Sequence, residues 1–187
     1  FWSLRTANPR GNMRPHSFSE EQDIYQNKFL RLYSVKADFG EFEKEYFVVD
    51  KGQRAGVLIL KNDEILLVRQ YRFLIDGMSW ELPGGGLNDS EDYELAAIRE
   101  CKEEAGIICT SVSPLLQYHQ GIDTTLSPAH LFICTEFTVQ DEFKNQETDE
   151  RKWFPVAEAL DMVMDGRIED SLTIVGLLAH YRLSNKS

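Results

Sequence analysis

Three glutamates, Glu100, Glu103 and Glu104, are spaced so that a helix would bring their carboxylates to one face. At about 100° per residue, with Glu100 at zero, Glu103 falls at roughly −60° and Glu104 at roughly 40°. Three neighbouring negative charges repel one another, and a divalent cation with oxygen ligands reverses that cost. The spacing therefore indicates a metal site, although a run of charges on a helix is more often a solvent-exposed surface.

The helix that carries these acids is predicted over residues 87–106, with Asp89 or Ser90 as its N-cap and Gly106 as its C-cap. Its apolar residues fall on the side opposite the acids. They are Leu95, Ile98, Cys101 and Ala105. We therefore expect the helix to bury its apolar side and to present the carboxylates on the other.

A glycine-rich segment, Pro83-Gly84-Gly85-Gly86, directly precedes the helix. Glycines let the backbone approach a ligand closely. The segment leads straight to a helix N-terminus, where a phosphate group can bind. Glycine loop and acidic helix together favour a site for a phosphate compound and a metal ion.

The composition limits the class of partner. The chain has 187 residues, a formal net charge of −11 and 42% hydrophobic residues. The charge argues against binding to nucleic acid or to an anionic membrane, and no apolar run reaches the length of a membrane span. Three cysteines without a CxxC pattern indicate a reducing compartment, so we expect a cytoplasmic protein.

The pattern of apolar residues predicts an α/β chain. Residues 1–22 are polar and are expected to form a mobile leader, with residues 1–12 either native or vector-derived. Antiparallel strands are expected within residues 28–50, and further strands at 56–60, 64–72 and 78–82, near 107–118 and at 130–137. A polar loop is predicted at 139–151, and helices at 156–166 and 168–183.

The segment from Gly85 to Ile107 also matches a known signature. Five residues separate Gly85 from Glu91, seven more lead to Arg99, and RECKEEAGI follows. This is the pattern Gx5Ex7REUxEExGU, and the chain resembles the Nudix hydrolases. The approach LLVRQYRFLIDGMSWELPGG is similar to the branch that contains the ADP-ribose pyrophosphatases. The segment 119–132 lacks an acid that many members carry there, so the resemblance leaves the sugar open.

The resemblance implies a fold and a set of partners. It implies a Nudix-type α/β/α sandwich with a mixed sheet, over residues 23–187, plus an N-terminal antiparallel β extension. The strands at about 28–50 resemble those that this branch uses for dimerisation and base binding, so a homodimer is expected. The expected cofactor is Mg²⁺, with Mn²⁺ as an alternative.

The resemblance also assigns roles to the residues of the box. Glu100, Glu103 and Glu104 match the metal-binding acids, and the Gly84 carbonyl matches a backbone ligand. Arg99 matches an arginine that is chiefly structural, and we expect it to orient the acids through an ion pair. Glu91 is expected to support the start of the helix.

Four residues outside the box complete the expected site. Arg72 matches an arginine that holds substrate phosphates. Glu81 lies in an apolar strand, so it needs a partner, either Arg99 or the ligand. In this branch the general base often comes from a late loop, and here the candidates are Glu147 and Glu150, with Glu147 preferred by its distance to Trp153.

The expected activity is magnesium-dependent hydrolysis of the pyrophosphate bond of a nucleoside diphosphate sugar such as ADP-ribose. A second possibility is a Nudix hydrolase of another diphosphate conjugate, a dinucleoside polyphosphate or a nucleoside triphosphate. A third, from another class, is a non-catalytic sensor of a nucleotide sugar. The sensor is disfavoured because such modules usually lose acids of the box, and this chain keeps them all.

Overall fold

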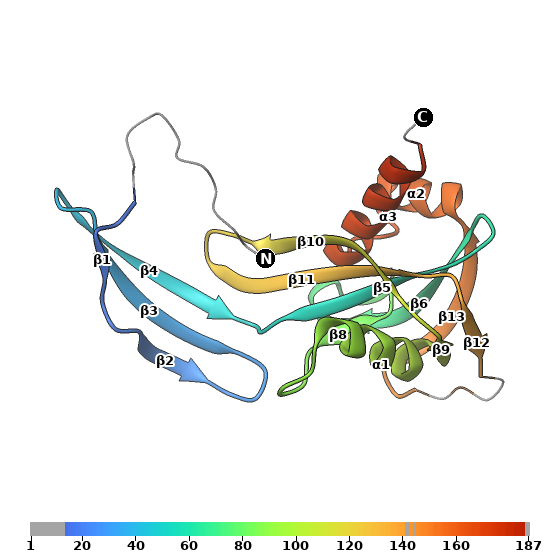
Figure 1. The fold of residues 1–187 in the computed structure, drawn as a ribbon, viewed down its shortest axis with the longest axis horizontal. Helices are drawn as coiled ribbons and strands as arrows, with labels where there is room; N and C mark the ends of the chain where they lie inside the picture. The colour runs from blue at the N-terminus through green and yellow to red at the C-terminus, as the bar shows by residue number, and fades with distance from the viewer. Residues whose placement is uncertain (1–13, 141–142, 144, 186–187) are drawn as a thin grey trace. The chain divides into compact units, whose positions relative to one another are not determined.

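The computed structural model describes residues 14–140, 143 and 145–185, and the chain divides into two compact units (Figure 1). One unit comprises residues up to Lys51 together with Gly121–Leu126. The other comprises Gly52–Gln120 and Ser127–Ser187. The second unit contains all the residues of the expected site.

The first unit is an antiparallel sheet of short strands. Strand β3 (Arg31–Asp38) pairs with β4 (Glu43–Asp50), and on its other edge with β1 (Ser17–Phe18) and β2 (Gln22–Gln26). The predicted N-terminal β extension is therefore confirmed. Strands β1 and β2 begin inside the predicted leader, and residues 1–13 of that leader lie outside the described residues.

The second unit is built on a mixed sheet. Strand β5 (Arg54–Lys61) lies parallel to β11 (Thr125–Cys134) and antiparallel to β6 (Glu64–Arg72) and β8 (Gly84–Gly86). Strand β6 also pairs antiparallel with β7 (Gly77–Glu81) and β13 (Thr148–Pro155). Strand β10 (Ser113–Gly121) pairs with β11, and β9 (Ile107–Cys109) pairs with β12 (Phe137–Val139).

Helices cover both faces of this sheet (Figure 1). Helix α1 (Tyr93–Ala105) packs on the face to which Ala55, Val57 and Ile59 of β5 point. Helices α2 (Val156–Met164) and α3 (Ser171–Ser184) cover the other face, with Leu58 and Leu60. Alternate residues of one strand thus enter separate cores, as a strand's period of two requires. The predicted α/β/α sandwich with a mixed sheet is confirmed.

Three further features bear on the sequence predictions. The loop expected over residues 139–151 is shorter than predicted, because Thr148–Arg151 form the start of β13 against β6. The cysteines are free thiols, and they lie in the core between α1 and the sheet; they are Cys101, Cys109 and Cys134. None of the helices in the described part of the chain combines the length and apolarity that a membrane span needs.

Candidate active site

Helix α1 begins later than the sequence suggested. The N-cap is Asp92, whose side chain accepts a hydrogen bond from the Leu95 amide at 2.8 Å, so the prediction of Asp89 or Ser90 is wrong. Ser90 instead takes a left-handed turn conformation, with φ of 64°. The helix ends where predicted, because Gly106 adopts φ of 59°, a conformation that favours glycine.

Two of the three acids do not lie on an exposed face. Glu100 and Glu104 are each only 9% exposed, whereas Leu95, predicted to be buried, is 58% exposed. Relative angles on a helix do not say which side will pack. Here the buried side includes Ala96 and Ala97, and it takes in two of the three acids. A solvent-exposed acidic surface is therefore excluded for Glu100 and Glu104, and only Glu103 has a largely exposed side chain.

The glycine loop fits tightly against these two acids. The Gly84 amide donates a hydrogen bond to Glu104 Oε2 at 2.7 Å. A Cβ atom on Gly85 would lie 2.3 Å from Glu100 Oε1, and a Cβ on Gly84 would lie 2.5 Å from the Ala55 carbonyl oxygen. Gly85 is thus required by the close approach of the Glu100 carboxylate, and Gly84 by the close approach of the β5 backbone.

Glu104 has a second partner that the sequence analysis did not single out. The side-chain amide of Gln70, itself 2% exposed, donates to Glu104 Oε1 at 2.9 Å. Burial raises the pKa of Glu104 to about 7, although the hydrogen bonds from Gly84 and Gln70 act in the opposite direction. Gln70 lies two residues before Arg72 on β6, and strand alternation could have placed both on the side of the acids.

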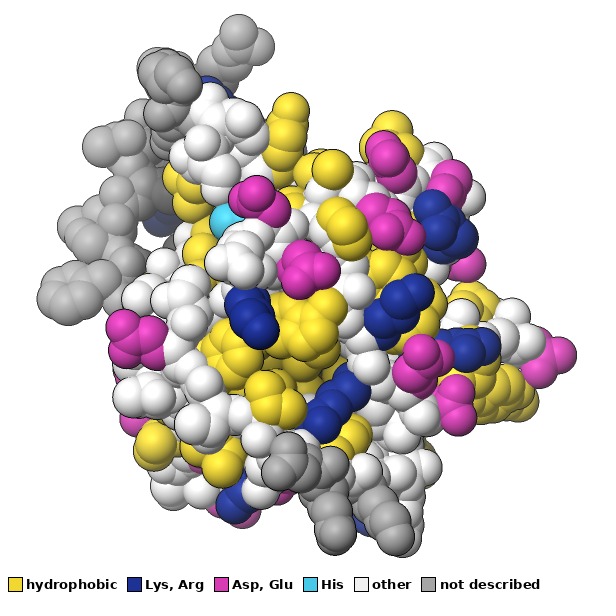
Figure 2. All heavy atoms as spheres, turned by 90° about the vertical axis from the view of Figure 1, so that its right-hand side faces the viewer, with side chains coloured by type: hydrophobic (Ala, Val, Ile, Leu, Met, Phe, Trp, Pro, Cys, Tyr) yellow, Lys and Arg dark blue, Asp and Glu magenta, His cyan; other side chains and the backbone are white. Residues whose placement is uncertain are grey.

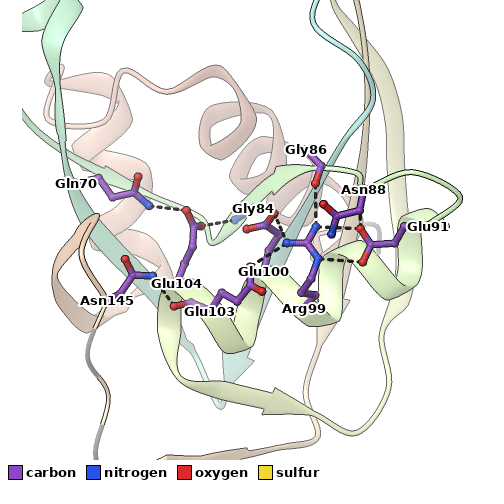
Figure 3. A network of polar contacts seen from close by, with 10 residues as sticks. All are labelled: Gln70, Gly84, Gly86, Asn88, Glu91, Arg99, Glu100, Glu103, Glu104 and Asn145. Carbon is purple, nitrogen blue, oxygen red and sulfur yellow. Dashed lines mark hydrogen bonds and ion pairs between the residues drawn. The ribbon is translucent and has the colours of Figure 1, made fainter. Parts of the chain in front are cut away.

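Arg99 links the acids to the glycine loop (Figure 3). Its Nη1 donates to Glu100 Oε1 at 2.8 Å and to Glu103 Oε2 at 2.9 Å, and its Nη2 donates to the Gly86 carbonyl at 2.9 Å. The predicted ion pair that orients the acids is present. Burial raises the pKa of Glu100 despite this pair.

Glu91 lies before the helix rather than in its first turn. It accepts two hydrogen bonds from Arg99, each at 2.9 Å, and one from the Asn88 amide at 2.9 Å. The Arg99 guanidinium lowers the pKa of Glu91. Its supporting action therefore comes from holding Arg99, and less from a helix dipole.

Arg72 and Glu81 are partners of each other. Arg72 Nε and Nη2 donate to the two oxygens of Glu81 at 2.7 and 2.5 Å. Arg99 or the ligand was the expected partner of Glu81, and the structure pairs Glu81 with Arg72 instead. The two strands β6 and β7 pair Arg72 with Gly77 and Val68 with Glu81, a register that sequence spacing does not reveal.

A cavity of about 600 Å³ adjoins the acids. Its lining includes Glu100, Glu103, Glu104 and, from the other side, Glu147. Glu150 is not part of that lining and pairs instead with Arg69, at 3.4 Å. The structure thus brings only Glu147, of the two candidate bases, to the acids of the helix.

Comparison with known proteins gives a family match. Residues 50–172 match the NUDIX domain family. The chain belongs to the Nudix family. A CMP-5'-(N-acetyl-N-hydroxy-3-aminopropyl)phosphonate hydrolase of Streptomyces rubellomurinus is 32% identical over 162 residues, 85% of this chain and 79% of that protein. The ADP-ribose pyrophosphatase of Bacillus subtilis is 25% identical over 157 residues, 83% and 80% of the two chains.

A solved structure supports the same fold. An ADP compounds hydrolase matches with a TM-score of 0.75 at 16% identity, over 91% of this chain and 94% of that one. The family model and the relatives found by sequence identify the protein as a Nudix hydrolase of the ADP-ribose pyrophosphatase branch. The signature pattern found in the sequence lies within the matched residues, and it comprises Gly85, Glu91, Arg99, Glu100, Glu103, Glu104 and Gly106.

The Nudix box offers the donors that a hard divalent cation prefers. Carboxylate oxygens of Glu100 and Glu103 both lie within 2.9 Å of one nitrogen of Arg99, so the chain already holds positive charge between them. Among the described residues, however, no three carboxylate, imidazole or thiolate side chains lie close enough together to hold a metal ion as they stand. The residues fit a metal ion in their chemistry, and the carboxylates would have to move closer together to hold one.

Proposed function

We propose that this Nudix hydrolase cleaves the pyrophosphate bond of a nucleoside diphosphate sugar of the ADP-ribose kind. The products would be a nucleoside monophosphate and a sugar phosphate. The observation that carries the proposal is the cavity that joins the three acids of α1 to Glu147. Its volume, about 600 Å³, is that of a typical small-ligand site.

Mg²⁺ is the proposed cofactor, with Mn²⁺ as an alternative. Glu100, Glu103, Glu104 and the Gly84 carbonyl would hold it. A bound divalent cation neutralises phosphate oxygens and lowers the pKa of a water ligand. Two buried carboxylates, each with a pKa raised by burial, support this assignment because a cation would relieve their desolvation.

The chain's own residues supply binding and proton transfer. Arg72 is proposed to contact the substrate phosphates with the N–H groups that Glu81 does not use, and Glu81 fixes its direction. Arg99 orients Glu100 and Glu103. Glu147 is proposed as the general base, because its exposed carboxylate lines the cavity.

Two other functions remain as alternatives. The Streptomyces relative is named for a CMP-linked phosphonate, so a cytidine conjugate is a second candidate substrate. The non-catalytic sensor is less well supported, because all four acids of the box, Glu91, Glu100, Glu103 and Glu104, are in place.

The proposed assembly is a homodimer with no nucleic-acid or membrane partner. The first unit exposes large apolar side chains suited to a subunit contact, among them Phe18, Tyr25, Phe29, Phe42 and Phe47. On the face shown in Figure 2, Asp and Glu (magenta) are interspersed with Lys and Arg (dark blue). The described residues of this face therefore form no extended basic surface of the kind that binds nucleic acid. A cytoplasmic location is proposed from the unpaired thiols.

A substrate panel tests the proposal. The purified protein is incubated with Mg²⁺ or Mn²⁺ and with ADP-ribose, other nucleoside diphosphate sugars, a CMP-linked phosphonate, dinucleoside polyphosphates and nucleoside triphosphates. Products are resolved by chromatography, with chelator-treated samples as controls. We expect the highest kcat/KM for a nucleoside diphosphate sugar. A highest value for a triphosphate, or binding without turnover of any compound, would refute the proposal.

A further inference from the structure

Asn145 connects the two sides of the acid-lined cavity (Figure 3). Its side-chain Nδ2 donates to the backbone carbonyl of Glu103 at 2.5 Å. Its Oδ1 accepts hydrogen bonds from the Glu147 amide at 2.6 Å and from the Thr148 amide at 3.2 Å. One side chain therefore ties the helix that carries the acids to the segment that carries Glu147.

The helix end explains why this contact is available. The last carbonyls of a helix have no partner within it. The Gly106 amide caps the carbonyls of Cys101 and Lys102. Arg151 donates to the Ala105 carbonyl at 2.6 Å, and Asn145 takes the carbonyl of Glu103. Two side chains that flank Glu147 thus satisfy carbonyls of the last turn of α1.

The turn at Asn145 also sets the direction of the chain at Glu147. An Asn side chain that accepts from the amides two and three residues later fixes a local turn. Within the part of the chain that the structure describes, the Glu147 carboxylate has no ion-pair partner, and the residue is exposed. Its position over the cavity therefore depends on its backbone, and that backbone is held by Asn145.

We propose that Asn145 is a positioning residue that holds Glu147 at the acids of α1. The proposal rests on the proposed function, in which Glu147 is the general base. Loss of the Asn145 side chain would leave the Glu147 and Thr148 amides without their acceptor and would release the segment from the helix. Because proton transfer needs a base within hydrogen-bond reach, turnover would fall while substrate binding at Arg72 would persist.

Kinetics on the best substrate of the panel separate this role from a general loss of structure. We expect Asn145→Ala to lower kcat by roughly tenfold to a hundredfold with KM changed by less than about threefold. Asn145→Asp keeps the acceptor for the two amides but loses the donor to Glu103, so an intermediate kcat is expected. Asp149→Asn, a change at an exposed neighbour that pairs with Arg69 at 3.8 Å, serves as the control and should match the parent.

A double-mutant cycle gives the decisive comparison. If Asn145 acts through Glu147, then Asn145→Ala should cost little further kcat in a Glu147→Gln background. An equal fold loss in both backgrounds, or an unchanged kcat for Asn145→Ala, would overturn the proposal. A fully active Glu147→Gln would also overturn the proposal, because Glu147 would then not be the general base. The proposed pyrophosphate hydrolysis would still stand.

Hydrogen exchange provides a measurement that does not need a substrate. The Glu147 and Thr148 amides should exchange faster in Asn145→Ala than in the parent, and Asp149→Asn should leave them unchanged. Unchanged exchange at these amides would refute the positioning role even if the substrate panel fails. Faster exchange in a protein that turns over no substrate would refute the proposed function. It would still show that Asn145 holds the backbone at Glu147.

Discussion

The carboxylate of Glu81 and the guanidinium of Arg72 form a two-bond ion pair, with distances of 2.7 and 2.5 Å. Glu81 is 6% exposed, and a bare carboxylate at such a position would be costly. The pair raises the pKa of Arg72, chiefly through the hydrogen bond to Glu81. Arg72 therefore has two tasks, to neutralise Glu81 and, as proposed, to contact the phosphates.

These two tasks can be separated by substitution. Arg72→Ala should raise KM by roughly ten to several hundredfold and should also lower stability, because Glu81 loses its partner. Adding Glu81→Gln should restore part of the stability without restoring KM. Steady-state kinetics and urea unfolding on the single and double variants check both parts. An unchanged KM for Arg72→Ala would mean that this arginine does not hold the substrate.

Gly85→Ala tests the fit between the glycine loop and the acids. A Cβ at this position would lie 2.3 Å from Glu100 Oε1, so the carboxylate must move. We expect activity to fall by about a hundredfold, with the far-UV circular dichroism preserved. Gly86→Ala is the matched control, because the nearest atom to its Cβ would be the Gln53 oxygen at 4.0 Å. Equal activities of the two variants would show that the close approach of Gly85 to Glu100 is not needed for turnover.

The pKa of Glu104 predicts a pH-dependent stability of the metal-free protein. Burial raises this pKa from its ordinary value of 4.5 to about 7. The folded protein then binds the proton more tightly than the unfolded chain, so stability falls as pH rises from about 4.5 to 7. The loss amounts to at most roughly 3 kcal/mol.

Urea unfolding with a chelator, at several pH values, measures this effect. The stability of the parent relative to Glu104→Gln should decrease over that interval and stay level above pH 7, where the folded-state pKa lies. Using the difference between the two proteins removes the contributions of other carboxylates. A parallel pH profile for the parent and the variant would show that Glu104 does not titrate in this way.

The homodimer is tested by the mass in solution. Sedimentation equilibrium of the parent should give twice the mass of one chain, because the first unit exposes Phe47 and other large apolar side chains. Phe47→Lys should shift the equilibrium toward the monomer. A parent that sediments as a monomer at all concentrations would exclude the dimer.

The sequence predicted the parts of the site that are local, and it missed those that depend on distant partners. Angular spacing correctly grouped Glu100 and Glu104, and adjacency correctly paired Arg99 with Glu100. The buried side of α1 was predicted only in part: Cys101 and Ala105 are buried as expected, but Leu95 is exposed and two of the acids are buried. A helix's own pattern does not show what will pack against it. The Gln70–Glu104 bond joins residues 34 positions apart, and only the folded strand brings them together.

The acids of α1 are proposed to hold a divalent cation for hydrolysis. The turnover of Glu103→Gln and Glu104→Gln as Mg²⁺ is titrated tests this assignment, with Glu94→Gln, an exposed acid of the same helix, as control. Both variants should be folded and should lose at least about a hundredfold in kcat, while the control retains the parent's activity. Near-normal turnover with magnesium in either variant would contradict the assignment of that acid as a metal ligand.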